Sequence, residues 1–118
     1  MNNNGFKNLV VWQRSFDLTV YIYKSLEGCR DFSFRDQIQR ASVSIMNNIA
    51  EGSGRKSDKA FLNYLSIAKG SCAEVESMIL LGAKLGYISE NDANKLTQDA
   101  CEVAKLLYGL MKKLKAQD

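Results

Sequence analysis

The polar side chains best suited to binding a ligand are concentrated between residues 37 and 57 of the 118-residue chain. They are Gln37, Arg40, Ser44, Asn47, Asn48, Glu51, Arg55 and Ser57. If this stretch is helical, positions 37, 40, 44 and 48 share one side of the helix, because they are three or four residues apart. Side chains of this kind commonly form hydrogen bonds between helices, which is our structural interpretation. The alternative is a polar surface for a ligand or partner, with Arg40 and Arg55 contacting an anion.

The residue types present argue against catalysis and metal binding. The sequence contains no histidine, which removes the commonest general base and the commonest transition-metal ligand. Helix bundles can hold two metal ions between Glu and Glu-x-x-His ligands, but here only Glu51, Glu74 and Glu76 lie near a potential core. The stretch Gly52–Ser57 lacks the spacing of a phosphate-binding loop. We therefore predict that the protein is not an enzyme and has neither a cofactor nor a metal site.

The three cysteines are too few and too scattered for a disulfide framework or a zinc site. Cys72 and Cys101 fall in apolar helical patterns and are predicted to be core residues, whereas Cys29 lies in a connector and is predicted to be exposed. The polar N-terminus shows no signal peptide, and no apolar run approaches the ~18 residues of a membrane span. We expect a cytoplasmic protein without a membrane partner.

Four segments place apolar residues three or four positions apart, as amphipathic helices do. The predicted caps are Asn8, Ser33, Ser57 and Ser89, and the first three helices are predicted to end at Gly28, Gly52 and Gly86. The first helix has its main apolar stripe at Leu9, Trp12, Phe16, Val20, Tyr23 and Leu26. The stripes of the others run from Phe34 to Ile49, from Phe61 to Ile79 and from Ala93 to Leu114.

These helices predict an all-α fold. No proline interrupts them, and no alternating pattern indicates a strand. Long helices joined by short loops pack as antiparallel neighbours. We predict a single domain over residues 1–118, an up-down-up-down antiparallel four-helix bundle with residues 1–6 as a disordered tail.

Two of the predicted helices are more apolar than one core-facing stripe requires. The first carries extra apolar residues at Val10, Val11, Leu18, Tyr21 and Ile22. The third carries them at Leu62, Tyr64, Ile67, Met78, Leu80 and Leu81. Large exposed apolar patches mark interfaces, so we predict self-association, although single apolar residues on a surface are ordinary.

The net charge of +3 is small for a nucleic-acid-binding protein. The basic excess lies in residues 1–59, because residues 60–118 carry seven basic and seven acidic side chains. The candidate contacts with nucleic acid are Arg35, Arg40, Arg55, Lys56 and Lys59. Lys112, Lys113 and Lys115 have a simpler explanation, because a helix C-terminus favours cations.

The run Asn48-Ile49-Ala50-Glu51-Gly52 has Gln37, Arg40 and Ser44 upstream and Arg55 and Ser57 downstream. With Leu9-Val10-Val11-Trp12-Gln13 and the stretch Phe61–Ser71, this pattern resembles the bacterial family of 23S rRNA intervening-sequence proteins. The resemblance covers about residues 6–112 and implies a four-helix bundle without catalytic residues. It implies a structural or interface role for Gln37, Ser44, Asn48, Glu51 and Gly52.

The family is related to the accessory variability protein of diversity-generating retroelements, a homopentamer that binds nucleic acid and partners a reverse transcriptase. The resemblance therefore implies a pentamer whose partners are RNA or DNA, or an enzyme that acts on nucleic acid. We expect a non-enzymatic oligomeric scaffold that binds nucleic acid weakly through basic surface, since assembly multiplies each basic patch. The alternative is an adaptor for another protein with no role in nucleic-acid binding.

Overall fold

The computed structural model describes residues 5–117, which form four long helices and one short turn. A 3₁₀ turn, η1 (Gly5–Asn8), leads into α1 (Val10–Ser25), followed by α2 (Phe32–Ser53), α3 (Asp58–Lys84) and α4 (Glu90–Ala116). Gly5 and Phe6, which we assigned to a disordered tail, belong to η1, and the Phe6 ring packs 5.0 Å from that of Trp12. Residues 1–4 of the expected tail lie outside the described residues.

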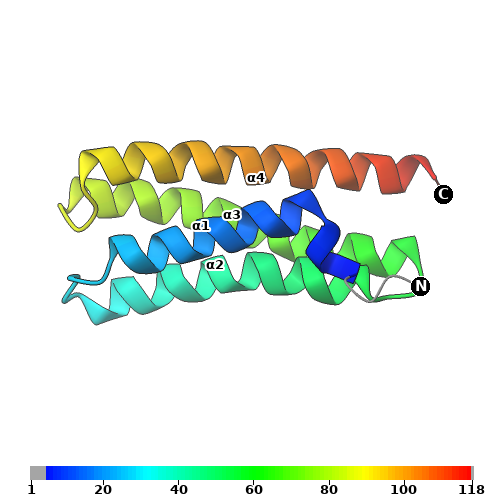
Figure 1. Ribbon diagram of the computed structural model, residues 1–118, viewed down its shortest axis with the longest axis horizontal. Coiled ribbons are helices and arrows are strands. Elements are labelled where there is room, and N and C mark those ends of the chain that lie inside the picture. The colour runs from blue at the N-terminus through cyan, green and yellow to red at the C-terminus, as the bar shows by residue number, and fades with distance from the viewer. Residues whose placement is uncertain (1–4, 118) are drawn as a thin grey trace.

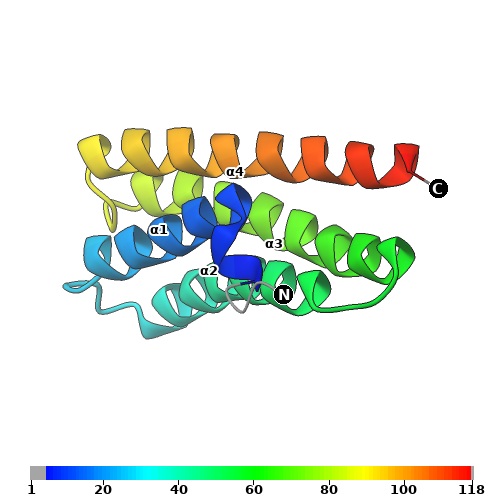
Figure 2. The same cartoon turned by 45° about the vertical axis from the view of Figure 1, so that its right-hand side comes forward.

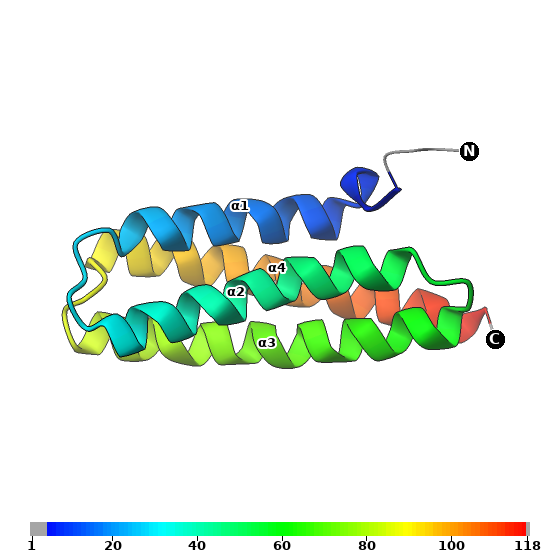
Figure 3. The same cartoon turned by 90° about the horizontal axis from the view of Figure 1, so that it is seen from below.

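The helices pack as an up-down-up-down bundle 45 Å long (Figure 1), and the predicted fold is confirmed. Within the described chain, α1 and α3 each contact α2 and α4 but not each other, so they occupy diagonal positions. The α2–α3 loop and the C-terminal end of α4 lie at one end of the bundle, and the other two loops lie at the opposite end. Figure 2 shows α3 beside α4 near the loop that joins them and diverging from it toward the α2–α3 loop, and Figure 3 shows α1 beside α2.

The caps explain where three of the helices begin. Ser57 and Ser89 accept hydrogen bonds from the amides of Ala60 and Asp92, as predicted. The predicted cap of α2 is wrong, because Asp31 rather than Ser33 accepts from a backbone amide, that of Phe34. The prediction for Asn8 is also wrong. It belongs to η1, and α1 begins after Leu9 without a side-chain cap.

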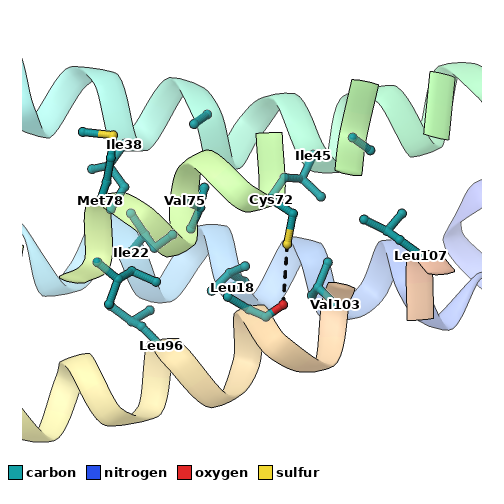
Figure 4. Packing of buried hydrophobic residues seen from close by; sticks show 14 of the residues in the cluster. Leu18, Ile22, Ile38, Ile45, Cys72, Val75, Met78, Leu96, Val103 and Leu107 are labelled. Carbon is teal, nitrogen blue, oxygen red and sulfur yellow. Dashed lines mark hydrogen bonds between the residues drawn. The ribbon is translucent and has the colours of Figure 1, made fainter. Parts of the chain in front are cut away.

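The core is apolar and draws on all four helices (Figure 4). The stripes predicted for α2, α3 and α4 face it, with residues such as Ile45, Val75 and Val103 fully buried. The stripe predicted for α1 is wrong. Its member Leu26, just after α1, is buried, and Leu9 and Trp12 pack partly against the core, but Phe16, Val20 and Tyr23 are exposed. Helix α1 instead buries Val11, Ser15, Leu18 and Ile22.

Two buried hydroxyl groups explain why α1 turns this face inward. Ser15 donates to the carbonyl of Val11 at 2.7 Å, and Thr19 donates to that of Ser15 at 2.8 Å. Thr19 also reaches the carbonyl of Ser42 on α2, at 3.2 Å. Because each hydroxyl has a carbonyl partner, its burial carries little desolvation penalty, and its small size lets α1 lie close to α2.

The cysteines differ from prediction at two of three positions. Cys72 is buried, as predicted, and its thiol donates to the carbonyl of Ala100 across the α3–α4 contact, shown dashed in Figure 4. Cys101 is exposed, because the adjacent Ala100 takes the core-facing position on α4. Cys29 is buried, because the chain folds its connector against the end of the bundle.

Candidate nucleic-acid interface

Arg35, the first of the predicted cationic contacts, is already engaged within the chain. It lies in the first turn of α2, where its guanidinium carbon is 4.7 Å from the centre of the Phe32 ring. Its Nη2 lies 3.2 Å from Oδ1 of Asp36. The neighbouring carboxylate offsets part of its charge, so Arg35 is a poor isolated contact for a phosphate.

Arg55, Lys56 and Lys59 surround the loop between α2 and α3. Arg55 donates to the Tyr64 hydroxyl at 2.7 Å and to Oε2 of Glu51 at 3.1 Å, and its guanidinium lies 5.0 Å from the centre of the Tyr64 ring. Lys56 and Lys59 are exposed and form no ion pair with any residue in 5–117. These two lysines are therefore free to contact an anion, whereas Arg55 first has to release internal partners.

Arg40 lies on a polar groove of about 580 Å³ between α2 and α3. The groove is also lined by Ser33, Asp36, Gln37, Ala41, Ser44, Ser71 and Glu74. Arg40 is exposed and makes no ion pair with a described residue. The two carboxylates of the lining reduce the attraction of this groove for phosphate, although Arg40 itself remains available.

The polar motif residues of α2 connect this helix to α3. Gln37 donates to Oε2 of Glu74 at 3.3 Å, and the hydroxyls of Ser44 and Ser71 lie 2.8 Å apart. Asn48 donates to the carbonyl and the hydroxyl of Ser44, at 2.8 and 3.1 Å. Both hydrogen bonds of Asn48 run back along α2. These contacts agree with the structural interpretation of the motif.

Gly52 has a specific packing role at the same contact. A Cβ atom at this position would lie 2.7 Å from Cβ of Tyr64 and 2.8 Å from Cδ1 of Phe61, both on α3. Side chains cannot approach that closely, so the last turns of α2 need glycine here to pack against α3. In the Glu-Gly pair of the motif, Glu51 therefore binds Arg55, and Gly52 allows α2 and α3 to pack closely.

The five predicted cationic residues do not form one surface. Arg35 and Arg55 lie at opposite ends of α2, about 30 Å apart at 1.5 Å per residue. Arg40 faces the α2–α3 groove between them, so only Arg55, Lys56 and Lys59 lie together. A single contact surface would have to draw on other cations near the α2–α3 loop.

The fold supplies those cations from α4. Lys112, Lys113 and Lys115 lie near the C-terminus of α4, at the same end of the bundle as the α2–α3 loop (Figure 1). We call Arg55, Lys56, Lys59, Lys112, Lys113 and Lys115 the basic end. The charge count over residues 60–118 did not reveal the lysines of the basic end, because it balanced them against carboxylates elsewhere in the same half. Residues 103–117 contain four lysines and no carboxylate, whereas Glu90, Asp92, Asp99 and Glu102 precede them. That run was the available signal.

No three His, Cys, Asp or Glu side chains in residues 5–117 are grouped so that they could hold a metal ion. None of the helices in that range is both long and apolar enough to cross a membrane.

The fold, with the polar residues of α2 bonded to α3, defines a small all-helical protein built as a single antiparallel bundle. The chain belongs to the 23S rRNA-intervening sequence protein family, whose sequence model matches residues 7–109. It is similar to a protein of unknown function from the S23 ribosomal protein family of Bacteroides thetaiotaomicron. The crystal structure of that protein superposes with a TM-score of 0.82 at 32% identity, covering 87% of this chain and 99% of that one. The search of curated proteins found no match.

Proposed function

We propose that the protein is a non-enzymatic, homo-oligomeric scaffold that binds the phosphate backbone of nucleic acid weakly through its basic end. The observation that supports self-association is a pair of exposed apolar faces, one on α1 and one on α3. The separation of charge along α4 supports the choice of nucleic acid as partner. A scaffold of this kind acts by positioning its partner, and contacts to phosphate confer little sequence preference.

The apolar face on α1 consists of Trp12, Phe16, Val20 and Tyr23, and we call it the α1 aromatic face. Phe16, Val20 and Tyr23 are 41%, 38% and 44% exposed, although the core-facing side of α1 is filled by other residues. Trp12 and Phe16 pack against each other with ring centres 5.1 Å apart. A contiguous aromatic surface of this kind is costly in water and is typical of a contact with another molecule.

A second copy of the chain is the occupant that fits this face, because α3 has its own exposed apolar residues. Ile67, Leu81 and Leu85 are each about half exposed. Since α1 and α3 are diagonal in the bundle, their outer faces point in different directions. Two different faces on one chain are what a head-to-tail ring requires, whereas a two-fold dimer uses one face twice. The number five is our proposal from the resemblance to the pentameric accessory variability protein.

Light scattering coupled to gel filtration tests the assembly. The expected mass is five times the 13.2 kDa of one chain. Phe16→Glu places a charge in the α1 aromatic face and should shift the mass toward one chain, whereas Thr97→Glu, at an exposed position on α4, should leave it unchanged. A wild-type protein that elutes as a 13.2 kDa monomer at all concentrations contradicts the proposal.

Assembly also strengthens the case for nucleic acid. The basic end carries six cations, with Glu51 and Asp58 as nearby carboxylates. One such patch binds phosphate weakly, but several copies on one assembly act together and raise the overall affinity. Each neutralised phosphate releases counterions, so the affinity must fall as salt rises.

Fluorescence anisotropy with a labelled 20-nucleotide RNA tests this contact. The affinity should be measurable at 50 mM salt and markedly weaker at 200 mM. Lys56→Glu combined with Lys59→Glu should weaken binding, whereas Lys24→Glu, at the opposite end of the bundle, should not. Absence of binding at 50 mM salt, or affinity that is indifferent to salt, contradicts the proposal and favours the protein-adaptor alternative.

A further inference from the structure

A second groove, on the opposite side of α3 from the Arg40 groove, combines an exposed aromatic ring with three lysines. It has a volume of about 230 Å³ and is lined by Lys69 of α3 and by Tyr108, Met111, Lys112 and Lys115 of α4. Tyr108, Met111 or Lys112, and Lys115 follow one another at intervals of three or four, so they share one face of α4. Two of these lysines belong to the basic end, which the groove extends along the bundle.

We propose that this groove binds single-stranded nucleic acid, with a base stacked on Tyr108 and backbone phosphates on Lys69, Lys112 and Lys115. The inference rests on the proposed function, because it assumes nucleic-acid binding, and it adds the location and the strandedness of the ligand. None of the cationic residues selected from the sequence lines this groove.

The ring of Tyr108 is the first reason for a base as ligand. Its side chain is 62% exposed, and its hydroxyl has no hydrogen-bond partner in the described chain. Tyr23 is also exposed, at 44%, but it lies on the α1 aromatic face and does not line this groove. Tyr21, Tyr64 and Tyr87 are less exposed and each bonds a charged side chain. An exposed aromatic ring offers a flat apolar surface on which any base can stack.

The side chains around the Tyr108 ring favour an anionic ligand such as the phosphate backbone. Residues 59–73 of α3 and 103–116 of α4 contain six lysines and no Asp or Glu. Lys69, Lys112 and Lys115 are exposed, and none pairs with a carboxylate in residues 5–117. Cations gathered around one groove repel each other, and an extended polyanion relieves that repulsion at several points at once.

The geometry selects single strands over duplexes. In a duplex each base is covered by its neighbours, so a side chain on the outer surface of a helix bundle reaches phosphates but no base face. In a single strand the bases can be splayed apart, and stacking on an aromatic ring combines with phosphate contacts to lysine. An acidic peptide would also satisfy the lysines, but it carries no base to stack on Tyr108.

The test compares full-length variants for binding to a labelled 20-nucleotide single-stranded RNA and to a 20-base-pair RNA duplex at 50 mM salt. Tyr108→Ala should weaken binding of the single strand about tenfold and change duplex binding little. Tyr108→Phe should retain single-strand affinity, because the ring remains. Lys112→Gln combined with Lys115→Gln should weaken both and lower the salt slope for the single strand by about 1.4.

Matched controls lie at the other end of the bundle. Phe32→Ala removes an exposed aromatic ring, and Lys84→Gln removes an exposed lysine, and neither should change affinity. Tyr108 is largely exposed, so its variants should unfold at the wild-type midpoint, which circular dichroism checks.

If the wild type binds RNA but Tyr108→Ala binds the single strand equally well, the inference is overturned and the proposed function stands. If the wild type binds no nucleic acid, both fail. If poly-glutamate binds the wild type and RNA does not displace it, the ligand is an acidic peptide. That outcome also overturns the inference.

Discussion

The hydroxyl of Tyr87 donates a hydrogen bond of 2.8 Å to Oδ2 of Asp31, while Oδ1 of the same carboxylate accepts from the amide of Phe34 at 3.1 Å. One side chain thus caps α2 and ties the α1–α2 loop to the α3–α4 loop. The rings of Phe34 and Tyr87 also pack edge to face, 5.2 Å apart. The two loops at this end of the bundle therefore form one connected structure.

The charge of Asp31 should make stability depend on pH. The hydrogen bond from the Phe34 amide and then that from Tyr87 hold the pKa of Asp31 below its ordinary value of 3.8. Since the folded-state pKa is the lower one, the stabilisation is complete above about pH 4 and is lost as the pH falls through the folded-state value. Asp31→Asn keeps an acceptor for the cap but removes the charge. We expect the variant to melt below wild type at pH 7 and the two to converge as the pH falls through the folded-state pKa of Asp31.

Thermal melts followed by circular dichroism between pH 7 and pH 2 measure this gap. Asp17→Asn serves as control, because that carboxylate is exposed on α1 and forms no hydrogen bond within the described residues. A gap for Asp31→Asn that stays constant or widens as the pH falls would show that the charge does not stabilise the folded state.

Gly52 and Gly70 should respond in opposite ways to the same substitution. Gly52→Ala forces a methyl group against Tyr64 and Phe61 of α3, and overpacking of this kind costs about 1–3 kcal/mol. Gly70 lies within α3 with no atom near the position of its missing Cβ, so Gly70→Ala should stabilise the chain by up to about 1 kcal/mol. Urea denaturation measures both values. Equal effects would show that the α2–α3 contact does not depend on glycine.

Two neighbouring residues of α1 test which side of this helix faces the core. Leu18 is fully buried, so Leu18→Ala should cost about 2–5 kcal/mol of unfolding free energy. Val20 is 38% exposed, so Val20→Ala should change it by about 0.5 kcal/mol or less. Denaturation is repeated over a series of protein concentrations, because loss of an assembly contact would appear as a concentration-dependent midpoint. If Val20→Ala lost more unfolding free energy than Leu18→Ala at every protein concentration, the stripe predicted from the sequence would be the one that faces the core.

The sequence predicts the orientation of α2, α3 and α4 correctly but not that of α1, for a physical reason. In α2, α3 and α4 the strongest apolar stripe is also the buried one, although α3 carries further apolar residues on its outer face. Helix α1 has two apolar stripes. The aromatic stripe through Phe16 is the heavier, but the buried stripe contains Ser15, whose hydroxyl is satisfied by a carbonyl that a periodicity argument does not count. Only packing against α2, including the contact from Thr19 to Ser42, decides between them.

The candidate site was predictable only in part, because it depends on which helix ends meet. Lys56 and Lys59 could be selected as neighbours from the sequence, since they flank one loop. Lys112 is more than fifty residues away and joins them only because α4 ends where α3 begins (Figure 1). A separate count for each half of each helix, rather than for each half of the chain, would have found the charge separation.

The reactivity of the three cysteines gives a last test of the packing. Burial, followed by the nearby Glu76 carboxylate, raises the pKa of the Cys72 thiol to about 12, so at pH 8 it stays protonated and unreactive. Cys29 is buried as well, whereas Cys101 is exposed on α4. Ellman's reagent at pH 8 should therefore react rapidly with one thiol per folded chain and with three after denaturation. Cys101→Ser should abolish the rapid phase, whereas Cys72→Ala should preserve it. A rapid phase that survives Cys101→Ser would mean that Cys29 is accessible, and that the loop held by Asp31 and Tyr87 opens in solution.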